Sequence, residues 1–374
     1  MSAAEGKVLL TGATGFVGME LLHRYLEQGD RQIVTLIRAK NDAAARARLD
    51  AVLANLFGRR ADRHARRVEA VAAELTAPGL ALDARRRERL ASEVTTIVHS
   101  AASVSFALPL EEARAINLEG TRRMLDFASL AMERGGLQRY GHVSTAYVAG
   151  THQGVFHECD HDRGQGFHNS YEQSKFEAEQ LVRSTGELPY TILRPSIVVG
   201  DRRSGWTAAF NVLYWPLRAF ARGLFEAVPA VPSAPVDVVS IDYVADAIHE
   251  LCEGPYGVGE TYHLTAGASA STIAEIAQMA SGYFRRPLPQ VLSPAEFAAR
   301  ECSDVSRRAL EGSSVYFPYF SIGAVFDETQ TRARLAPAGI EVTPLREYIV
   351  RLLDFATLSR WGKNPISRYV ALAA

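Results

Sequence analysis

Strand-like and helix-like segments alternate along the first half of the chain, and this pattern restricts the fold more than any other feature. Short runs rich in Val, Ile, Leu and Thr are separated by longer segments rich in Ala, Leu, Arg and Glu. The strand-like runs cover residues 7–11, 32–38, 68–74, 94–100, 140–145 and 189–195, and the helical segments include residues 16–28, 41–57 and 109–134. Strict alternation implies parallel strands joined by right-handed helical crossovers. We therefore predict an α/β fold, a doubly wound parallel sheet with helices on both faces.

A glycine-rich segment, TGATGFVG, follows the first strand-like run and opens the helix over residues 16–28. We expect Gly12 at the turn, Gly15 at the approach to a phosphate and Gly18 at the contact between strand and helix. Without a Cβ, the backbone can adopt positive φ, and its N–H groups can approach a pyrophosphate at the positive end of a helix. The preceding strand and following helix favour a dinucleotide-binding Rossmann fold over an ordinary turn, although the GxxGxxG spacing differs from the usual GxGxxG.

Basic residues follow the second strand-like run. Arg38 ends that run and Lys40 comes two residues later, where an NAD-specific site usually has an acidic residue for the ribose 2′-hydroxyl. A guanidinium can instead bind a 2′-phosphate through charge-assisted hydrogen bonds. We therefore predict NADPH/NADP+ as the cofactor, and a solvated basic loop is the alternative.

The alternation breaks in the second part of the chain. Residues 201–235 carry several aromatic residues among prolines, and after a brief return of the strand–helix pattern the remainder is mostly helical. We predict an NADP(H)-binding Rossmann domain over residues 1–200 and a substrate-binding region over residues 201–374, with residues 236–265 returning to the sheet. The C-terminal part would form a mostly helical substrate cap.

Composition excludes several classes of protein. The chain has 374 residues, of which 47% are hydrophobic, enough for a large core, and its formal net charge of −1 argues against a nucleic-acid partner. Cys159, Cys252 and Cys302 are far apart, which indicates a reducing compartment. The N-terminus leads straight into a strand without room for a signal peptide, and no apolar run reaches the roughly 18 residues of a membrane span. We expect a cytoplasmic protein.

The stretch SYEQSKFEAE places Tyr171 and Lys175 one turn apart on one face of a helix. The strand-like run before it ends in Ser144 and Thr145, and ligands of such folds lie beyond the carboxyl ends of the strands. A nearby ammonium and the positive nicotinamide ring would lower the pKa of a tyrosine from its usual value near 10. Lys175 can supply the ammonium and hold the nicotinamide ribose, whereas Thr145 can position a substrate oxygen. We therefore predict a catalytic pair rather than a tyrosine packed on a lysine stem.

These motifs together resemble the extended short-chain dehydrogenase/reductase family over roughly the first two thirds of the chain. The resemblance is carried by TGATGFVG, VHSAASVSF (residues 98–106), NLEGT (residues 117–121), HVSTAYV and the YxxxK motif. It implies a catalytic triad of Thr145, Tyr171 and Lys175, with Thr145 preferred to Ser144 by alignment with the family pattern. It also implies that Asn117 helps a proton-relay water, with a helix-kinking polar residue as the alternative. The cofactor contacts that we assign are Thr11, Gly12, Thr14, Gly15, Phe16, Val17, Gly18, Arg38, Ala101, Lys175, Pro195 and Ile197.

Two further motifs are similar to the fatty acyl-CoA reductases and carrier-protein thioester reductases, the male-sterility branch of that family. They are RPSIVVGDRRSGW (residues 194–206) and PVDVVSIDYVADAI (residues 235–248), whereas nucleotide-sugar epimerases and dehydratases tend to show RxxNxYGP. Many thioester reductases have Lys or Arg where this chain has Met19, so more of the phosphate binding falls to Arg38. The resemblance implies NADPH-dependent reduction of acyl thioesters to the aldehyde, with a second hydride giving the alcohol.

The residues fit thioester reduction, because hydride addition makes an oxyanion that the hydroxyls of Thr145 and Tyr171 can stabilise. The aromatic residues from Trp206 to Phe225 either line a site for the acyl group or pack the core of the cap. The basic runs over residues 59–67 and 85–89 are either solvated faces or receive an acidic carrier protein or the phosphates of CoA.

The remaining expectations concern delivery, metals and alternative functions. The chain shows no adenylation signature and no carrier-attachment motif, so we expect the acyl group to arrive in trans, on CoA or a carrier protein. His152, His157, His161 and His168 match no zinc spacing, and we predict no metal site. An NADP(H)-dependent ketone reductase or alcohol dehydrogenase acting on a hydrophobic small molecule stays open. So does a non-catalytic NADP(H)-sensing protein, against which the intact triad argues.

Overall fold

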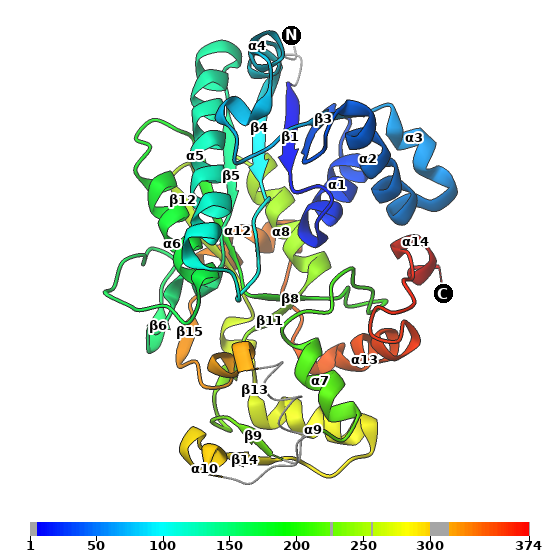
Figure 1. The fold of residues 1–374 in the computed structure, drawn as a ribbon, viewed down its shortest axis with the longest axis vertical. Helices are drawn as coiled ribbons and strands as arrows, with labels where there is room; N and C mark the ends of the chain where they lie inside the picture. Colours follow the sequence, from blue (N-terminus) through cyan, green and yellow to red (C-terminus); the bar gives the residue numbers. More distant parts are fainter. Residues whose placement is uncertain (1–5, 225–226, 256, 300–313, 374) are drawn as a thin grey trace.

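The computed structural model describes residues 6–224, 227–255, 257–299 and 314–373, and a seven-stranded parallel sheet forms the middle layer of its upper half in Figure 1. Its strands, in spatial order, are β12 (Glu260–Leu264), β7 (Tyr190–Pro195), β5 (Arg139–Val143), β4 (Val94–His99), β1 (Lys7–Thr11), β2 (Ile33–Ile37) and β3 (Val68–Ala72). The order reverses between β1 and β4, which is the switch point of a doubly wound Rossmann sheet. The predicted fold class is therefore confirmed.

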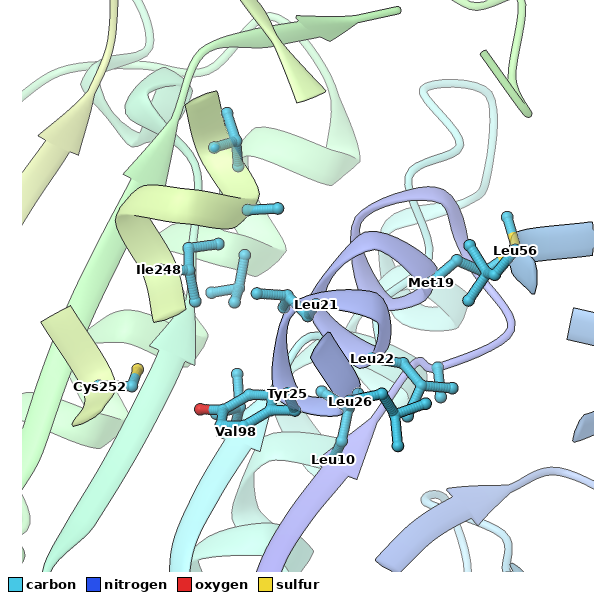
Figure 2. Packing of buried hydrophobic residues seen from close by; sticks show 14 of the residues in the cluster. Leu10, Met19, Leu21, Leu22, Tyr25, Leu26, Leu56, Val98, Ile248 and Cys252 are labelled. Carbon is cyan, nitrogen blue, oxygen red and sulfur yellow. The ribbon is translucent and has the colours of Figure 1, made fainter. Parts of the chain in front are cut away.

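Helices cover both faces of this sheet. One face carries α1 (Phe16–Gln28), α2 (Asp42–Phe57) and α8 (Ile241–Glu253), and the other carries α4 (Ala84–Glu93), α5 (Leu110–Gly135) and α6 (Ser170–Arg183). Figure 2 shows Leu21 and Tyr25 of α1 facing Ile248 and Cys252 of α8. Neighbouring side chains of β1 divide between the two cores, since Leu10 belongs to the first and Leu9 to the second.

Beyond the carboxyl ends of the strands, short parallel and antiparallel strand pairs and several of the remaining helices pack around a third hydrophobic core. The pairs are β8 (Ile197–Val199) with β11 (Val238–Ser240), β10 (Pro235–Val236) with β13 (Ser271–Thr272), β9 (Ala227–Pro229) with β14 (Gln290–Leu292), and β6 (Gly154–Phe156) with β15 (Ala324–Phe326). The helices around it include α7 (Tyr214–Ala221), α9 (Ile273–Phe284) and α13 (Ile349–Leu358), with a 3-10 helix η5 (Ser314–Phe320). Helix α10 (Pro294–Ala298) lies beside β9 and β14, α12 (Thr329–Leu335) packs against α8 and β12, and α14 (Arg368–Ala371) packs against α2.

Residues 236–265, expected to return to the sheet, divide between two places. Strand β12 adds an edge to the seven-stranded sheet beside β7, whereas β11 pairs with β8 outside it. The boundary between a cofactor domain over residues 1–200 and a substrate-binding region over residues 201–374 stays a prediction.

Several aromatic residues of the stretch that begins at Trp206 are buried and pack against other parts of the chain. The buried indole of Trp206 donates its Nε1–H to the carbonyl of Ile366 at 3.0 Å, and its ring centroid lies 5.7 Å from that of Phe16. Tyr214 and Phe220 are also buried. The structure therefore supports the packing interpretation for these rings.

A few sequence expectations fall on other parts of the chain. Phe225, Cys302 and the first five residues lie outside the described residues. Of the other thiols, Cys159 is exposed and Cys252 is buried. Within the described part of the chain, no helix combines the length and the apolar character needed to cross a bilayer.

Candidate active site

The glycine loop lies at the carboxyl end of β1, and two of its glycines are required by close backbone contacts. Gly12 has a φ of 76°, and a Cβ there would lie 2.8 Å from the backbone nitrogen of Ala101. A Cβ on Gly18 would lie 2.0 Å from the carbonyl oxygen of Gly12, so any side chain would push α1 away from the loop. Gly15 caps α1 and donates its N–H to the Gly12 carbonyl at 2.8 Å.

The amino end of α1 has the properties of a pyrophosphate site. Its cap residue, Gly15, has no side chain to occupy the free N–H groups of Phe16 and Val17. The first turn, which the structure describes in full, carries no acidic residue. Free N–H groups and the positive end of the helix dipole favour a phosphate. The residues present therefore fit a dinucleotide cofactor.

Thr11 joins the ends of β1 and β4. Its buried hydroxyl oxygen accepts the N–H groups of Ser100 and Ala101 at 3.2 and 3.1 Å, and lies 2.8 Å from Nδ1 of His99. These bonds hold Ala101 against the glycine loop. Thr11 thus fixes the glycine loop against the end of β4.

Beside the glycine loop, basic groups gather at the end of β2. Arg38 follows β2 directly and is exposed, as is Lys40. Arg48 of α2 donates one guanidinium N–H to the Arg38 carbonyl at 2.5 Å and another to Oγ1 of Thr14 at 3.1 Å. Arg48 was missed in the sequence, where it is one of several arginines on a predicted helix. Only the fold brings it back to the glycine loop.

Thr145 and Ser144 follow β5, and only one of these buried hydroxyls is directed toward Tyr171. Ser144 donates its hydroxyl hydrogen to the buried carboxylate of Glu179 at 2.8 Å. Thr145 instead interacts with the hydroxyl of Tyr171, and its Oγ1 lies 3.4 Å from the carbonyl oxygen of Pro195. This arrangement supports choosing Thr145 over Ser144 as the predicted substrate-positioning hydroxyl.

Tyr171 lies in the first turn of α6, partly buried beside Phe106. Burial raises the pKa of its hydroxyl to about 12, while the hydrogen bond with Thr145 opposes the shift. The sequence predicts a pKa lowered by Lys175 together with the positive nicotinamide ring of the cofactor. The structure differs because the low-polarity surroundings of the phenol disfavour its anion. At neutral pH the group is a phenol that can donate a proton.

Lys175 follows one turn later on α6 and is buried. Its ammonium donates to the carbonyl of Val143, the last residue of β5, at 2.8 Å. Burial lowers the pKa of Lys175 to about 8, and the carboxylate of Glu179 opposes that shift. The neighbouring His99 and His142 are buried, and burial together with Lys175 lowers the pKa of both imidazoles. Of these three groups, Lys175 is therefore the one that carries the positive charge.

A buried ion pair holds α6 in place. The guanidinium of Arg194, next to Pro195, donates to both carboxylate oxygens of Glu179, at 2.6 and 3.1 Å. Although burial acts in the opposite direction, Arg194 and Arg183 hold the pKa of Glu179 below its usual range. Glu179 also accepts from Ser144, so one carboxylate connects α6 to the ends of β5 and β7. Its spacing, four residues after Lys175, was a sequence signal that we did not use.

Asn117 is buried on α5, and its amide is fully engaged. Its Oδ1 accepts the N–H of Ser103 at 2.8 Å, and its Nδ2 donates to the Ser103 carbonyl at 3.1 Å and to Oγ of Ser174 at 2.9 Å. Asn117 therefore fixes the loop after β4 against α6. A proton-relay role for Asn117 stays a prediction.

The remaining assigned residues are placed by the same loops. Pro195 ends β7, and its carbonyl faces Thr145. Ile197 begins β8 and is buried. The structure thus brings Thr145, Tyr171, Lys175 and Pro195 together, whereas Arg38 lies apart at the end of β2.

The histidines of the loop before α6 have separate partners. His157 lies 2.9 Å from the carboxylate of Asp327, and His168 lies 3.0 Å from that of Glu172. The imidazole of His161 stacks on Phe176. Each has a local structural contact.

Comparison with known proteins adds a family to this geometry. The family model described as male sterility protein matches residues 10–248. The isonitrile lipopeptide synthase of Streptomyces coeruleorubidus is 33% identical over 255 residues, which cover 66% of this chain and 17% of the synthase. Human fatty acyl-CoA reductase 1 is 30% identical over 278 residues, which cover 65% of this chain and 53% of the reductase. The matched part of the chain thus spans about half or less of these curated relatives.

A solved structure resembles nearly the whole chain. The terminal R domain from the myxalamid PKS-NRPS biosynthetic pathway superposes with a TM-score of 0.82 and 27% sequence identity. The superposition covers 98% of this chain and 94% of that domain. The similarity therefore includes the C-terminal part that lies beyond the family match.

Proposed function

Because the chain belongs to the male sterility protein family of extended short-chain dehydrogenases/reductases, we propose that it reduces acyl thioesters with NADPH. One observation carries the proposal: the hydroxyls of Thr145 and Tyr171 interact with each other, and the buried ammonium of Lys175 lies one helical turn after Tyr171 on α6. The likeness to a terminal reductase domain and to a fatty acyl-CoA reductase supports a thioester as the substrate. A shared fold alone would not identify the substrate, because one fold can carry many different activities.

The chain's residues would act on the thioester carbonyl. Thr145 and Tyr171 donate hydrogen bonds to the carbonyl oxygen and stabilise the negative charge that develops there. When bound, the nicotinamide supplies the hydride. Tyr171 gives its proton to the oxygen, and Lys175 holds positive charge beneath the phenolate that forms. As the C–S bond breaks, the hemithioacetal hydroxyl returns its proton to Tyr171 and the thiolate takes one from solvent, which leaves an aldehyde and a thiol.

The cofactor would lie along the glycine loop with its adenosine toward Arg38. Gly12, Gly15 and the amino end of α1 would hold the pyrophosphate. The exposed guanidinium of Arg38, together with Arg48, gives a 2′-phosphate two cationic partners. This pair supports NADPH over NADH.

The acyl group would arrive on CoA or on a carrier protein, since both present the same thiol arm. Proteins of both kinds resemble this chain: a fatty acyl-CoA reductase by sequence and a thiolation-reductase di-domain by fold. Delivery in trans, a location in the cytoplasm and the number of hydrides transferred stay predictions.

The test combines a substrate panel with two product assays. Purified protein is incubated with NADPH and an acyl-CoA, an acyl-carrier protein or a ketone. In separate reactions it is incubated with NADP+ and a secondary alcohol. We expect free thiol to appear in step with NADPH oxidation, and a hydrazine reagent to trap aldehyde. Turnover of ketones or alcohols without thiol release would instead identify a ketone reductase or alcohol dehydrogenase. Cofactor binding without any turnover would identify a sensing protein.

A further inference from the structure

A cluster of aromatic rings surrounds Tyr171 on the side of the loop after β4. The ring of Phe106 lies 5.7 Å from that of Tyr171 and stacks on Tyr319 at 5.2 Å with an interplanar angle of 8°. Tyr316 meets Phe106 edge-on at 5.7 Å, and Tyr147 meets Tyr319 edge-on at 5.0 Å. Phe106, Tyr147, Tyr316 and Tyr319 are called here the aromatic wall.

The wall joins distant parts of the chain through Glu172, which follows Tyr171. The hydroxyl of Tyr319, from η5, donates to the buried carboxylate of Glu172 at 2.5 Å across 147 residues of sequence. Asn169 donates to the same hydroxyl at 3.0 Å, and the backbone of His168 donates to Glu172 at 2.8 Å. The buried Tyr319 is therefore fixed by polar contacts, although its ring packs on apolar neighbours.

The four residues of the aromatic wall differ in their exposure to solvent. Tyr147 and Tyr319 are buried, whereas Phe106 and Tyr316 are only partly buried. The partly buried members are thus two aromatic rings, one of which, Phe106, lies beside the ring of Tyr171. A thioester carbonyl carries an acyl chain on one side and a pantetheine arm on the other. The pantetheine arm has amides that need polar partners, so apolar rings suit the acyl chain.

Resting on the proposed function, we propose that Phe106 and Tyr316 contact the acyl chain and make the enzyme selective for extended apolar acyl groups. Tyr319 is then a positioning residue, because it touches no substrate but holds Phe106 and η5 against Tyr171 through Glu172. The bond between Tyr319 and Glu172 connects acyl selectivity to the catalytic helix.

The test compares acetyl-CoA with decanoyl-CoA, which share one thiol arm. In the parent protein we expect kcat/KM to be higher for decanoyl-CoA. Phe106→Ala and, separately, Tyr316→Leu should lower the ratio of kcat/KM for decanoyl-CoA to kcat/KM for acetyl-CoA about tenfold or more. Tyr319→Phe keeps the ring but not the hydrogen bond, and should lower kcat/KM for decanoyl-CoA without altering the Kd of NADPH.

A matched control is Tyr283→Leu, which removes a partly buried tyrosine of α9 whose hydroxyl donates to Asp354 of α13. It should leave the ratio of the two substrates unchanged. Equal losses for both acyl groups in the Phe106 and Tyr316 variants, or no preference for decanoyl-CoA in the parent, would overturn the inference while the proposed function stands. A parent that reduces no thioester overturns both. Since the two ring variants are independent, one that fails to fold leaves the other to decide.

Discussion

At Tyr171, the surroundings favour the neutral phenol, which is the form a reductase needs in order to donate a proton. Its pKa is raised to about 12 by burial, and Thr145 and Phe106 hold the ring in place. Tyr171→Phe should keep the fold and the affinity for NADPH while lowering kcat roughly a hundredfold or more, because only the proton donor is removed. Steady-state kinetics and fluorescence titration measure the two quantities.

Ser144→Ala is a useful comparison, since it also removes a hydroxyl at the end of β5. Ser144 donates to Glu179 rather than to the position proposed for the substrate. We expect a smaller effect on kcat than that of Tyr171→Phe. A Tyr171→Phe variant with near-parental turnover would show that another group donates the proton.

Lys175 sets a different limit on activity. Burial lowers its pKa to about 8, so the ammonium is present below that pH and is lost above it. Cofactor binding and stabilisation of the phenolate both need that charge, so kcat/KM should be level below about pH 8 and fall about tenfold per pH unit above it. Tyr171, with its pKa near 12, would remain protonated through this range.

A pH–rate profile checks this limit, and Lys175→Arg tests its origin. Arginine keeps its charge across the range, so any activity that remains in the variant should show no decline near pH 8. A parental profile that stays level to pH 10 would be incompatible with this role for Lys175.

At the scale of elements, sequence periodicity predicted the strands of the main sheet to within two residues at either end. The predicted run over residues 94–100 is β4 (Val94–His99), and residues 7–11 are β1 itself. Long apolar runs between clear helices leave little choice of register. The partner of strand β11 could not be predicted, because a three-residue strand has too little sequence pattern to show which strand it pairs with.

The pairing of Tyr171 and Lys175 on α6 could be predicted from the sequence, but the contacts that hold α6 in place could not. Tyr171 and Lys175 are linked by helical spacing, which is local. The contact between Glu172 and Tyr319 depends on how the C-terminal part returns over α6, and no local pattern encodes it. Arg48 was missed for the same reason, because its closeness to Thr14 follows from the packing of α2 beside the glycine loop.

The predicted preference for NADPH over NADH depends on two arginines, one directly after β2 and one on α2. Because Arg38 and Arg48 would both bind the 2′-phosphate, we expect NADPH to bind more tightly than NADH. Arg38→Glu and Arg48→Gln should each weaken NADPH binding by about tenfold to a hundredfold, the usual worth of a charge-assisted hydrogen bond, and leave NADH binding little changed. Fluorescence titration with both cofactors measures this.

Arg46→Gln supplies the matched control for that experiment. Arg46 lies on the same helix and is partly buried, and its guanidinium pairs with Asp50 at 2.9 Å and donates to the carbonyl of Ala65 at 3.2 Å. It should not alter the ratio of the two affinities. Equal affinities of the parent protein for NADPH and NADH would refute the assignment of Arg38 and Arg48.

At the scale of the whole molecule, the C-terminal end returns to the cofactor-binding half. Helix α14 lies beside α2 and α1 in Figure 1, and Arg368 forms an ion pair with the buried carboxylate of Glu20 on α1. The other oxygen of Glu20 accepts from Arg24 at 2.8 Å, and Arg24 pairs with Asp246 of α8 at 2.5 Å. One network thus links the chain's end to the helix that follows the glycine loop.

Removing one member of this network should affect both stability and cofactor binding. Arg368→Met leaves Glu20 with a single cationic partner in a buried position, so we expect the free energy of unfolding to fall by about 3 kcal/mol. Because α1 opens at the glycine loop, the affinity for NADPH should fall severalfold as well. Arg360→Met, an exposed arginine in the same tail, should change stability by no more than about 0.5 kcal/mol. Urea unfolding with and without NADPH measures both effects, and an Arg368→Met variant as stable as the parent would mean that Arg24 alone suffices for Glu20.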